Sequence, residues 1–207
     1  MPSPLGHSLI GYIIYRARAT VVLGQQWQLM ALYLFAANAP DLDFIPGFVI
    51  GNPNRYHHGI SHSIGVALFF SIGLSSLRFV LRRDRFARKL GIFFLLYCSH
   101  LALDYLSADT SPPHGQPLLW PFSGTYYIAP VAVFPDIRRV SSSTGNFVIS
   151  LINLHNLWAA CLELVLLFPL LLVVQAIRKA RATIIVVHPP VGTGHAGSSM
   201  GSSADIE

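Results

Sequence analysis

Four long apolar stretches divide the chain, with polar or turn-forming residues between them. They cover residues 27–39, 64–81, 90–106 and 157–177, and a shorter apolar segment lies before Arg16 and Arg18. A helix needs about 20 mostly apolar residues, with a range of roughly 17–25, to cross a bilayer. The last three stretches meet this length, whereas the first two segments are marginal. The pattern therefore predicts an all-α fold, a polytopic membrane bundle of about five helices.

A segment of about 40 residues, 107–146, joins the fourth and fifth predicted helices and is rich in Pro, Gly, Ser and aromatic residues. Loops of this length are usually functional or disordered. Large side chains such as Trp120 and Phe122 argue against disorder, so we expect a packed loop at the membrane interface. Residues 188–207 are small and polar and are predicted to be a disordered tail, which leaves 1–187 as a single domain.

The composition agrees with a bilayer environment. Of the 207 residues, 53% are hydrophobic and only 11% are charged, whereas an ordinary soluble domain carries about 25% charged residues. These values exclude a disordered chain and argue against a soluble monomer. Cys98 and Cys161 both lie in apolar stretches, so neither a disulfide framework nor a cysteine zinc site is indicated.

Basic residues gather at one end of the predicted helices. If successive helices alternate in direction, the clusters at 16–18, 78–89 and 178–181 lie on one membrane face and hold eleven of the fourteen Lys and Arg residues. By the positive-inside rule this face is cytoplasmic. The basic charge therefore indicates topology, and no nucleic acid partner is expected.

Histidine and acidic residues gather at the opposite helix ends. The same topology places there His7, Asp41, Asp43, His57, His58, His62, His100, Asp104, His155 and Glu163. Because apolar residues alone define the predicted helices, this convergence is independent support for a shared site.

Two of these groups have spacings that suit a metal ion. Asp41 and Asp43 lie in a turn flanked by prolines, where both carboxylates can face one cation. His58 and His62 are four residues apart, which places both imidazoles on one face if the segment is helical. Carboxylate oxygen and imidazole nitrogen suit zinc, manganese or iron. The structural alternative is a helix cap or turn for the aspartates and an interfacial position for the histidines.

Two further acids lie in the apolar segments. Asp104 follows His100 by four residues on one helical face, and Glu163 lies in the most apolar segment. An Asp at the centre of a spanning helix costs about 2.5–3.5 kcal/mol, so such acids are functional candidates. We expect the first pair to bind metal and Glu163 to be a ligand or general base; hydrogen bonds between helices are the alternative. Asn156 is a polar neighbour of Glu163, and the role of His155 stays open.

With these residues assembled, the sequence resembles the YdjM-like family of membrane-bound metal-dependent hydrolases. The resemblance covers roughly residues 5–165 and is carried by His7, the Pro-Asp-Leu-Asp turn at 40–43, the block His57–Ser63, the His-x-x-x-Asp helix at 100–104 and the loop Gly115–Phe122. His58 stands where the family often has Arg. Either His57 or His58, or both, could therefore bind a metal together with His62.

This family is similar to zinc-dependent phospholipase C and to single-strand nucleases, which are all-helical enzymes that hold metals with His and Asp. The resemblance implies phosphoester hydrolysis at a divalent metal cluster, with zinc expected and manganese or iron(II) as alternatives. The expected metal ligands are His7, Asp41, Asp43, His57, His58, His62, His100 and Asp104, and the expected catalytic residues are Asp41, Asp43 and Glu163. The expected location is the cell inner membrane, with the metal site on the face opposite the basic loops.

The aromatic loop favours a site that opens at the lipid interface, so a phospholipid or isoprenoid phosphoester is the expected substrate. The alternative from another class is a non-enzymatic membrane protein, either a scaffold or a metal-handling protein. In that case the same ligands would bind a cation without hydrolysis. A structural site is closed by protein ligands, whereas a catalytic site keeps a position open for water.

Overall fold

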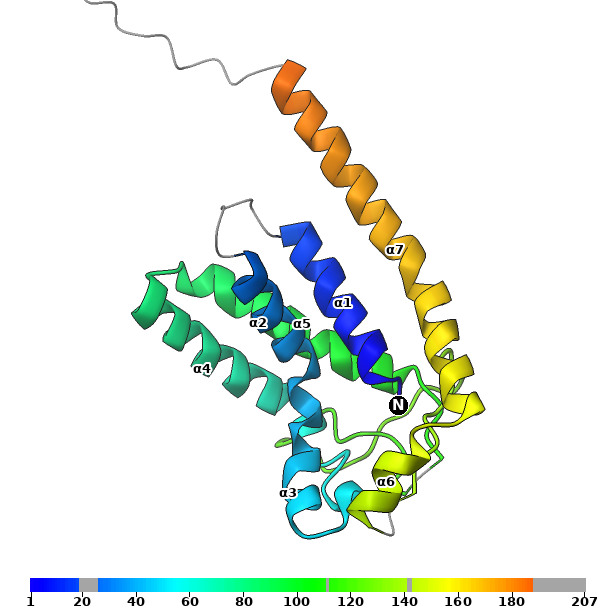
Figure 1. Cartoon of the computed structure of the whole chain (residues 1–207). Coiled ribbons are helices and arrows are strands. Elements are labelled where there is room, and N and C mark those ends of the chain that lie inside the picture. Colours follow the sequence, from blue (N-terminus) through cyan, green and yellow to red (C-terminus); the bar gives the residue numbers. More distant parts are fainter. Residues whose placement is uncertain (19–25, 111, 141–142, 188–207) are drawn as a thin grey trace, which may run out of the picture.

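The fold is all-α in the part of the chain that the structure describes. This computed structural model describes residues 1–18, 26–110, 112–140 and 143–187 (Figure 1). Its α-helices are α1 (Pro4–Arg18), α2 (Gln26–Asn38), α3 (Phe44–Val49), α4 (Ile64–Arg82), α5 (Phe86–Tyr105), α6 (Thr144–Ser150) and α7 (Leu154–Val187). The 3-10 helices η1 (Ala39–Asp43), η2 (Pro53–Arg55) and η3 (Ile60–His62) lie between α2 and α4. The predicted tail, 188–207, lies outside the described residues.

Local signals set the bounds of the long helices. Ser63 caps α4, because its hydroxyl accepts a hydrogen bond from the Val66 N–H at 3.2 Å. The helix ends where Arg83 adopts a left-handed conformation with φ of 54°. Helix α5 starts at Phe86, before the predicted apolar stretch. Hydropathy does not include its first turn, because that turn contains Arg88 and Lys89. Helix α7 continues through Pro169 and beyond the apolar stretch.

Three helices are long and apolar enough to cross a membrane, namely α4, α5 and residues Leu154–Arg181 of α7. Only 17%, 39% and 22% of their most apolar windows are buried inside the protein. Most of this apolar surface therefore needs a bilayer to cover it. Helices α1 and α2, with 15 and 13 residues, are shorter than the length of about 20 residues that a span needs.

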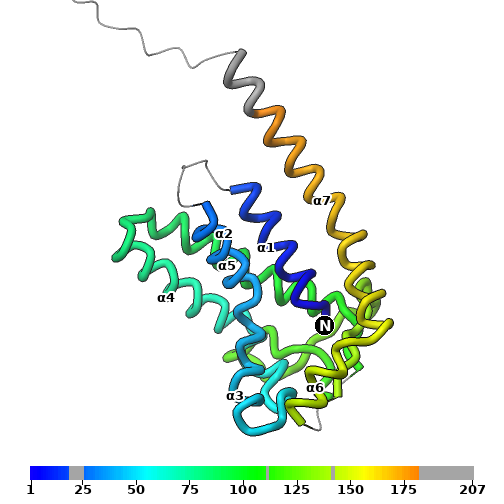
Figure 2. Tube along the Cα trace, viewed as in Figure 1, coloured from blue at the N-terminus to red at the C-terminus, as the bar shows by residue number. Residues whose placement is uncertain are grey.

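The helices pack in pairs, with α4 against α5 and α1 against α2, while α2 also contacts α5. The α1–α2 contact is close because Gly11 has no side chain: a Cβ there would lie 2.9 Å from the Cβ of Ala37. Tyr33, Phe93 and Leu96 fill the space between α2 and α5. Helix α7 contacts α1 and extends past the end of the bundle (Figure 2).

The segment between α5 and α6 is irregular but packed, as predicted. Within it, the backbones of Gln116 and Tyr127 form two hydrogen bonds to each other, with N to O distances of 3.0 and 2.9 Å. It also joins the start of α4, where the Ile64 N–H donates to the Leu118 carbonyl at 2.9 Å. Phe134 is buried in a cluster with Leu103 of α5 and Leu167 of α7. Together with α3 and α6, this segment covers one end of the bundle (Figure 1).

Candidate metal centre

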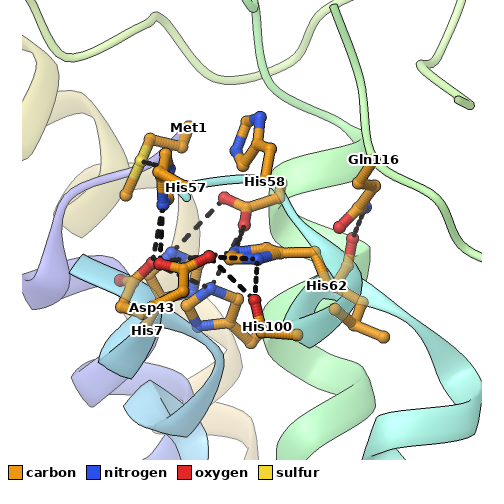
Figure 3. Close-up of polar contacts among 12 residues, drawn as sticks. Met1, His7, Asp43, His57, His58, His62, His100 and Gln116 are labelled. Atoms are coloured by element: carbon orange, nitrogen blue, oxygen red, sulfur yellow. Dashed lines mark hydrogen bonds and ion pairs between the residues drawn. The ribbon is translucent and has the colours of Figure 1, made fainter. Parts of the chain in front are cut away.

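The predicted ligands converge where four segments meet at the covered end of the bundle (Figure 3). The start of α1 supplies His7, η1 supplies the two aspartates, the turn before α4 supplies three histidines, and the end of α5 supplies His100 and Asp104. Four overlapping sets of these side chains have ligand atoms within 4.8 Å of one another. The arrangement therefore contains enough donors for at least one cation.

Asp104 lies among three imidazoles. Its Oδ2 is 3.1 Å from Nε2 of His100 and 3.3 Å from Nε2 of His62, and its Oδ1 is 3.6 Å from Nε2 of His7. Only 1% of the Asp104 side chain is exposed. His100 and Asp104 share one face of α5, as their spacing predicts.

Asp41 approaches the same imidazoles from η1. Its Oδ1 is 3.5 Å from Nε2 of His100 and 3.7 Å from Nε2 of His62. The ring of His7 stacks on that of His100, with 3.6 Å between centroids. Two carboxylates from different elements thus face one group of histidine nitrogens.

Many polar atoms at the centre of this group have no hydrogen bond, although they are buried. Within the described ranges they are both ring nitrogens of His7, Nε2 of His62 and of His100, Oδ1 of Asp41 and both carboxylate oxygens of Asp104. A buried polar atom without a partner costs about 1–3 kcal/mol, and more if it is charged. A cation between these atoms would satisfy them, and imidazole nitrogen with carboxylate oxygen is a donor set that suits zinc. The residues therefore fit a divalent cation.

Surrounding groups hold two of these imidazoles in the orientation that metal binding needs. His100 donates from Nδ1 to the Ala37 carbonyl at 2.9 Å, which leaves its Nε2 lone pair facing the carboxylates. Nδ1 of His62 lies 3.1 Å from the Ser61 hydroxyl and 3.2 Å from Oδ2 of Asp43. Ser61 also donates to Asp43 at 2.8 Å. Asp43 thus contacts Nδ1 of His62, which leaves Nε2 of that ring facing Asp41 and Asp104.

Asp43 also holds His57. Its Oδ1 is 3.1 Å from Nδ1 of His57, whose ring stacks on Phe44. Burial lowers the pKa of His57 to about 3, despite the nearby carboxylate. Burial would raise the pKa of Asp43, but hydrogen bonds to His57 and His62 hold it below its usual range. A neutral His57 beside an ionised Asp43 keeps both side chains able to bind a cation, and Asp41, Asp43 and His57 form one of the close sets.

The predicted helical face through His58 and His62 is wrong. Helix α4 begins only at Ile64, and His58 has a left-handed backbone with φ of 59°. The turn ending at Gly59 and the short η3 replace the expected helix. The two rings still lie 5.0 Å apart, because the turn folds His58 back toward His62.

Sequence reasoning missed Asp109, which lies next to His58. Its Oδ2 is 3.3 Å from Nδ1 of His58 and accepts a hydrogen bond from the Gly115 N–H at 2.7 Å. Its short distance in sequence from Asp104 was the only available signal, because the irregular loop gives no periodicity. Asp109 thus orients His58 from the covering segment.

Glu163 lies apart from the close sets of ligand atoms. Its carboxylate accepts hydrogen bonds from the Ser3 N–H at 2.7 Å and the Ser3 hydroxyl at 2.5 Å. Gly6 permits this approach, since a Cβ there would lie 2.6 Å from Oε2 of Glu163. From α7, Glu163 therefore caps the first turn of α1, the helix that carries His7.

The other polar residues at the start of α7 bind the covering segment. His155 lies 2.9 Å from the Asp136 carbonyl, and the Asn156 side chain bonds both the N–H and the carbonyl of Arg138 at 2.8 Å. These contacts fix the covering segment to α7, and His155 belongs to no close ligand set among the described residues.

Replacing Glu163 by Ala should destabilise the protein, because Ser3 would lose a buried acceptor. We expect a loss of about 1–3 kcal/mol in unfolding free energy, measured by denaturant unfolding in detergent. Glu163→Gln keeps a carbonyl oxygen and should lose less. Equal stability of the wild type and the Ala variant would contradict the capping role. If Glu163 is instead a general base, the Gln variant should keep its metal but lose hydrolysis.

Residues 1–185 match the model of a family described as YdjM inner membrane protein. No curated protein and no solved structure matches the chain. The family match covers almost the whole chain and agrees with the apolar helices α4, α5 and α7. This protein therefore belongs to the YdjM inner membrane protein family.

Proposed function

We propose that this membrane protein is a metal-dependent hydrolase that cleaves phosphoesters. The His/Asp cluster would hold the divalent cation, which we expect to be zinc. The observation that carries the proposal is the group of buried nitrogen and oxygen atoms around Asp41 and Asp104 that lack hydrogen bonds. A purely structural polar core would join these atoms in hydrogen bonds of good geometry, whereas here they face one another at 3.1–3.7 Å without one.

His7, His62, His100, Asp41 and Asp104 would hold the cation. When bound, the cation would lower the pKa of a water molecule and stabilise negative charge on a phosphoryl oxygen. Asp41 has 14% of its side chain exposed, against 0% for His62 and His100 and 1% for Asp104. Asp41 is therefore nearest to solvent and is the best placed of these residues to accept a proton and contact substrate.

A lipid-like substrate is supported by the apolar residues beside the cluster. Leu42 lies between the two aspartates, Ile45 follows them, and Ile60 lies between His58 and His62 in sequence; these side chains are 43%, 55% and 55% exposed. An apolar rim next to a cationic centre suits a molecule with a hydrocarbon part and a phosphoester. The covering segment carries a further apolar side chain, Phe122, which is 95% exposed.

We place the basic helix ends in the cytoplasm and the cluster on the opposite face. This orientation is supported by the basic residues at the end of α1, between α4 and α5 and near the end of α7. The substrate would then meet the cluster at the outer surface of the inner membrane.

Near-complete burial of His7, His62, His100 and Asp104 favours one alternative, a cation that has only a structural role. In that case the protein ligands would fill every coordination position, and a catalytic site would keep one for water. Metal-loaded protein with no activity toward any phosphoester would support this alternative.

The test is hydrolysis by purified, zinc-loaded protein in detergent with phospholipid and isoprenoid phosphoesters. Asp41→Asn should lower kcat/KM by at least about 100-fold, because general-base and electrostatic contributions are of this size. His155→Gln is the control: this residue lies at the same end, outside the cluster, and the change should leave activity unchanged. Equal activity of wild type and Asp41→Asn would refute the proposal.

A further inference from the structure

A second feature lies at the other end of α5, where α4 turns back into α5. Here a cavity of about 290 Å³ opens between the end of α1, the start of α2 and the α4–α5 turn. Lys89 and Asp104 are fifteen residues apart on α5, which corresponds to about 22 Å at 1.5 Å per residue. The cavity is thus separate from the candidate metal centre.

Positive side chains dominate the lining of this cavity. They are Arg18, Arg83, Arg85, Arg88 and Lys89. Arg83, which has a left-handed backbone at the end of α4, and the short turn before Phe86 bring the last four of these cations together. Tyr33, 1% exposed, lies in the lining on the side of α2.

Protein carboxylates do not neutralise this charge. Asp84 is the one acid in the lining, and it is already paired with Arg78 at 2.6 Å and with Lys89 at 3.7 Å. Across the described ranges, Arg85 and Arg88 have no acidic partner. Like charges that line one cavity repel one another. An anion bound in the cavity would relieve that repulsion.

We propose that this cavity binds the phosphate group of an anionic membrane lipid. Guanidinium groups match phosphate oxygens in geometry and charge. The cavity lies at the ends of two membrane-spanning helices, at the level where headgroups lie. Two or three residues in sequence from lining residues of the cavity, Trp27, Val80 and Leu81 are 67%, 67% and 65% exposed. These apolar side chains would contact the acyl chains, which distinguishes a lipid from free phosphate.

The experiment measures binding to the full-length chain in a neutral detergent by native mass spectrometry. The probes are dioctanoyl phosphatidylglycerol, dioctanoyl phosphatidylcholine and inorganic phosphate. We expect the wild type to hold one phosphatidylglycerol at least about 10-fold more tightly than either other probe. The double variant Arg85→Gln/Arg88→Gln should bind it about 30-fold more weakly, since each cation contributes to the attraction.

Arg82→Gln/Arg181→Gln is the matched control, because these exposed arginines lie at the same end of the helices but outside the cavity lining. It removes the same charge and should bind like the wild type. Arg85→Lys/Arg88→Lys keeps the charge without the guanidinium geometry and should recover part of the binding, which guards against misfolding as the cause of the loss. Equal weakening in the Gln variant and the control would overturn the proposal. Phosphate binding as tight as that of phosphatidylglycerol would overturn the assignment to a lipid.

Discussion

Asp104→Asn is expected to abolish metal binding at the cluster. The carboxylate lies 3.1–3.6 Å from Nε2 atoms of three histidines, and both of its oxygens are buried without a hydrogen bond. The amide keeps the shape but removes the negative charge and turns one acceptor into a donor. Because loss of an outer-shell partner already costs about 10–100-fold in metal affinity, loss of this central ligand should cost more. Metal content of the purified protein, measured by mass spectrometry, is the readout.

The matched control for this variant is Glu163→Gln. Both changes convert a buried acid to its amide within a membrane-spanning helix, but Glu163 contacts Ser3 and lies outside the close ligand sets. The control should therefore retain stoichiometric metal. If Asp104→Asn binds as much metal as the control does, the cluster is not the metal site.

Removal of the metal by a chelator should lower the melting temperature by roughly 8–16 °C. A ligand present at 1,000 times its Kd stabilises the native state by about 4 kcal/mol, and each kcal/mol moves the melting temperature of a chain of this size by about 2–4 °C. The physical cause is the return of uncompensated carboxylates and imidazoles to a buried space. Thermal unfolding in detergent, with and without chelator and after zinc is restored, measures the effect.

Asp104→Asn serves again as the reference. Because this variant should hold no cation, its melting temperature should not respond to chelator or to added zinc. A similar response in wild type and variant would indicate that the chelator acts elsewhere on the protein or on the detergent.

Much of the helical framework is predictable, since hydropathy reports directly on long apolar helices. The stretches at 64–81, 90–106 and 157–177 correspond to α4, α5 and α7. The pairing of His100 with Asp104 is also predictable, because a spacing of four fixes it within one helix.

Contacts between distant segments are not predictable in this way. Ser3 meets Glu163 across 160 positions, and His58 meets Asp109 through an irregular loop. No periodic pattern encodes these pairs, because helix packing and loop geometry determine them. For the same reason the spacing of His58 and His62 predicts a helix, whereas the chain forms a left-handed turn at His58. Gly59 permits this turn, since a Cβ there would lie 2.8 Å from the Tyr56 carbonyl oxygen.

The contact between Glu163 and Ser3 also connects the cluster to the thickness of the bilayer. Residues Leu154–Arg181 of α7 number 28, a length of about 42 Å at 1.5 Å per residue. The apolar stretch within it, 157–177, spans about 32 Å of this length and matches a hydrocarbon core of about 30 Å. In a thinner bilayer such a helix would tilt, kink or locally thicken the bilayer. Because the carboxylate that caps α1 sits on this helix, a change in tilt pulls on the turn that carries His7. Lipid composition would thus act mechanically on the geometry of the ligand set.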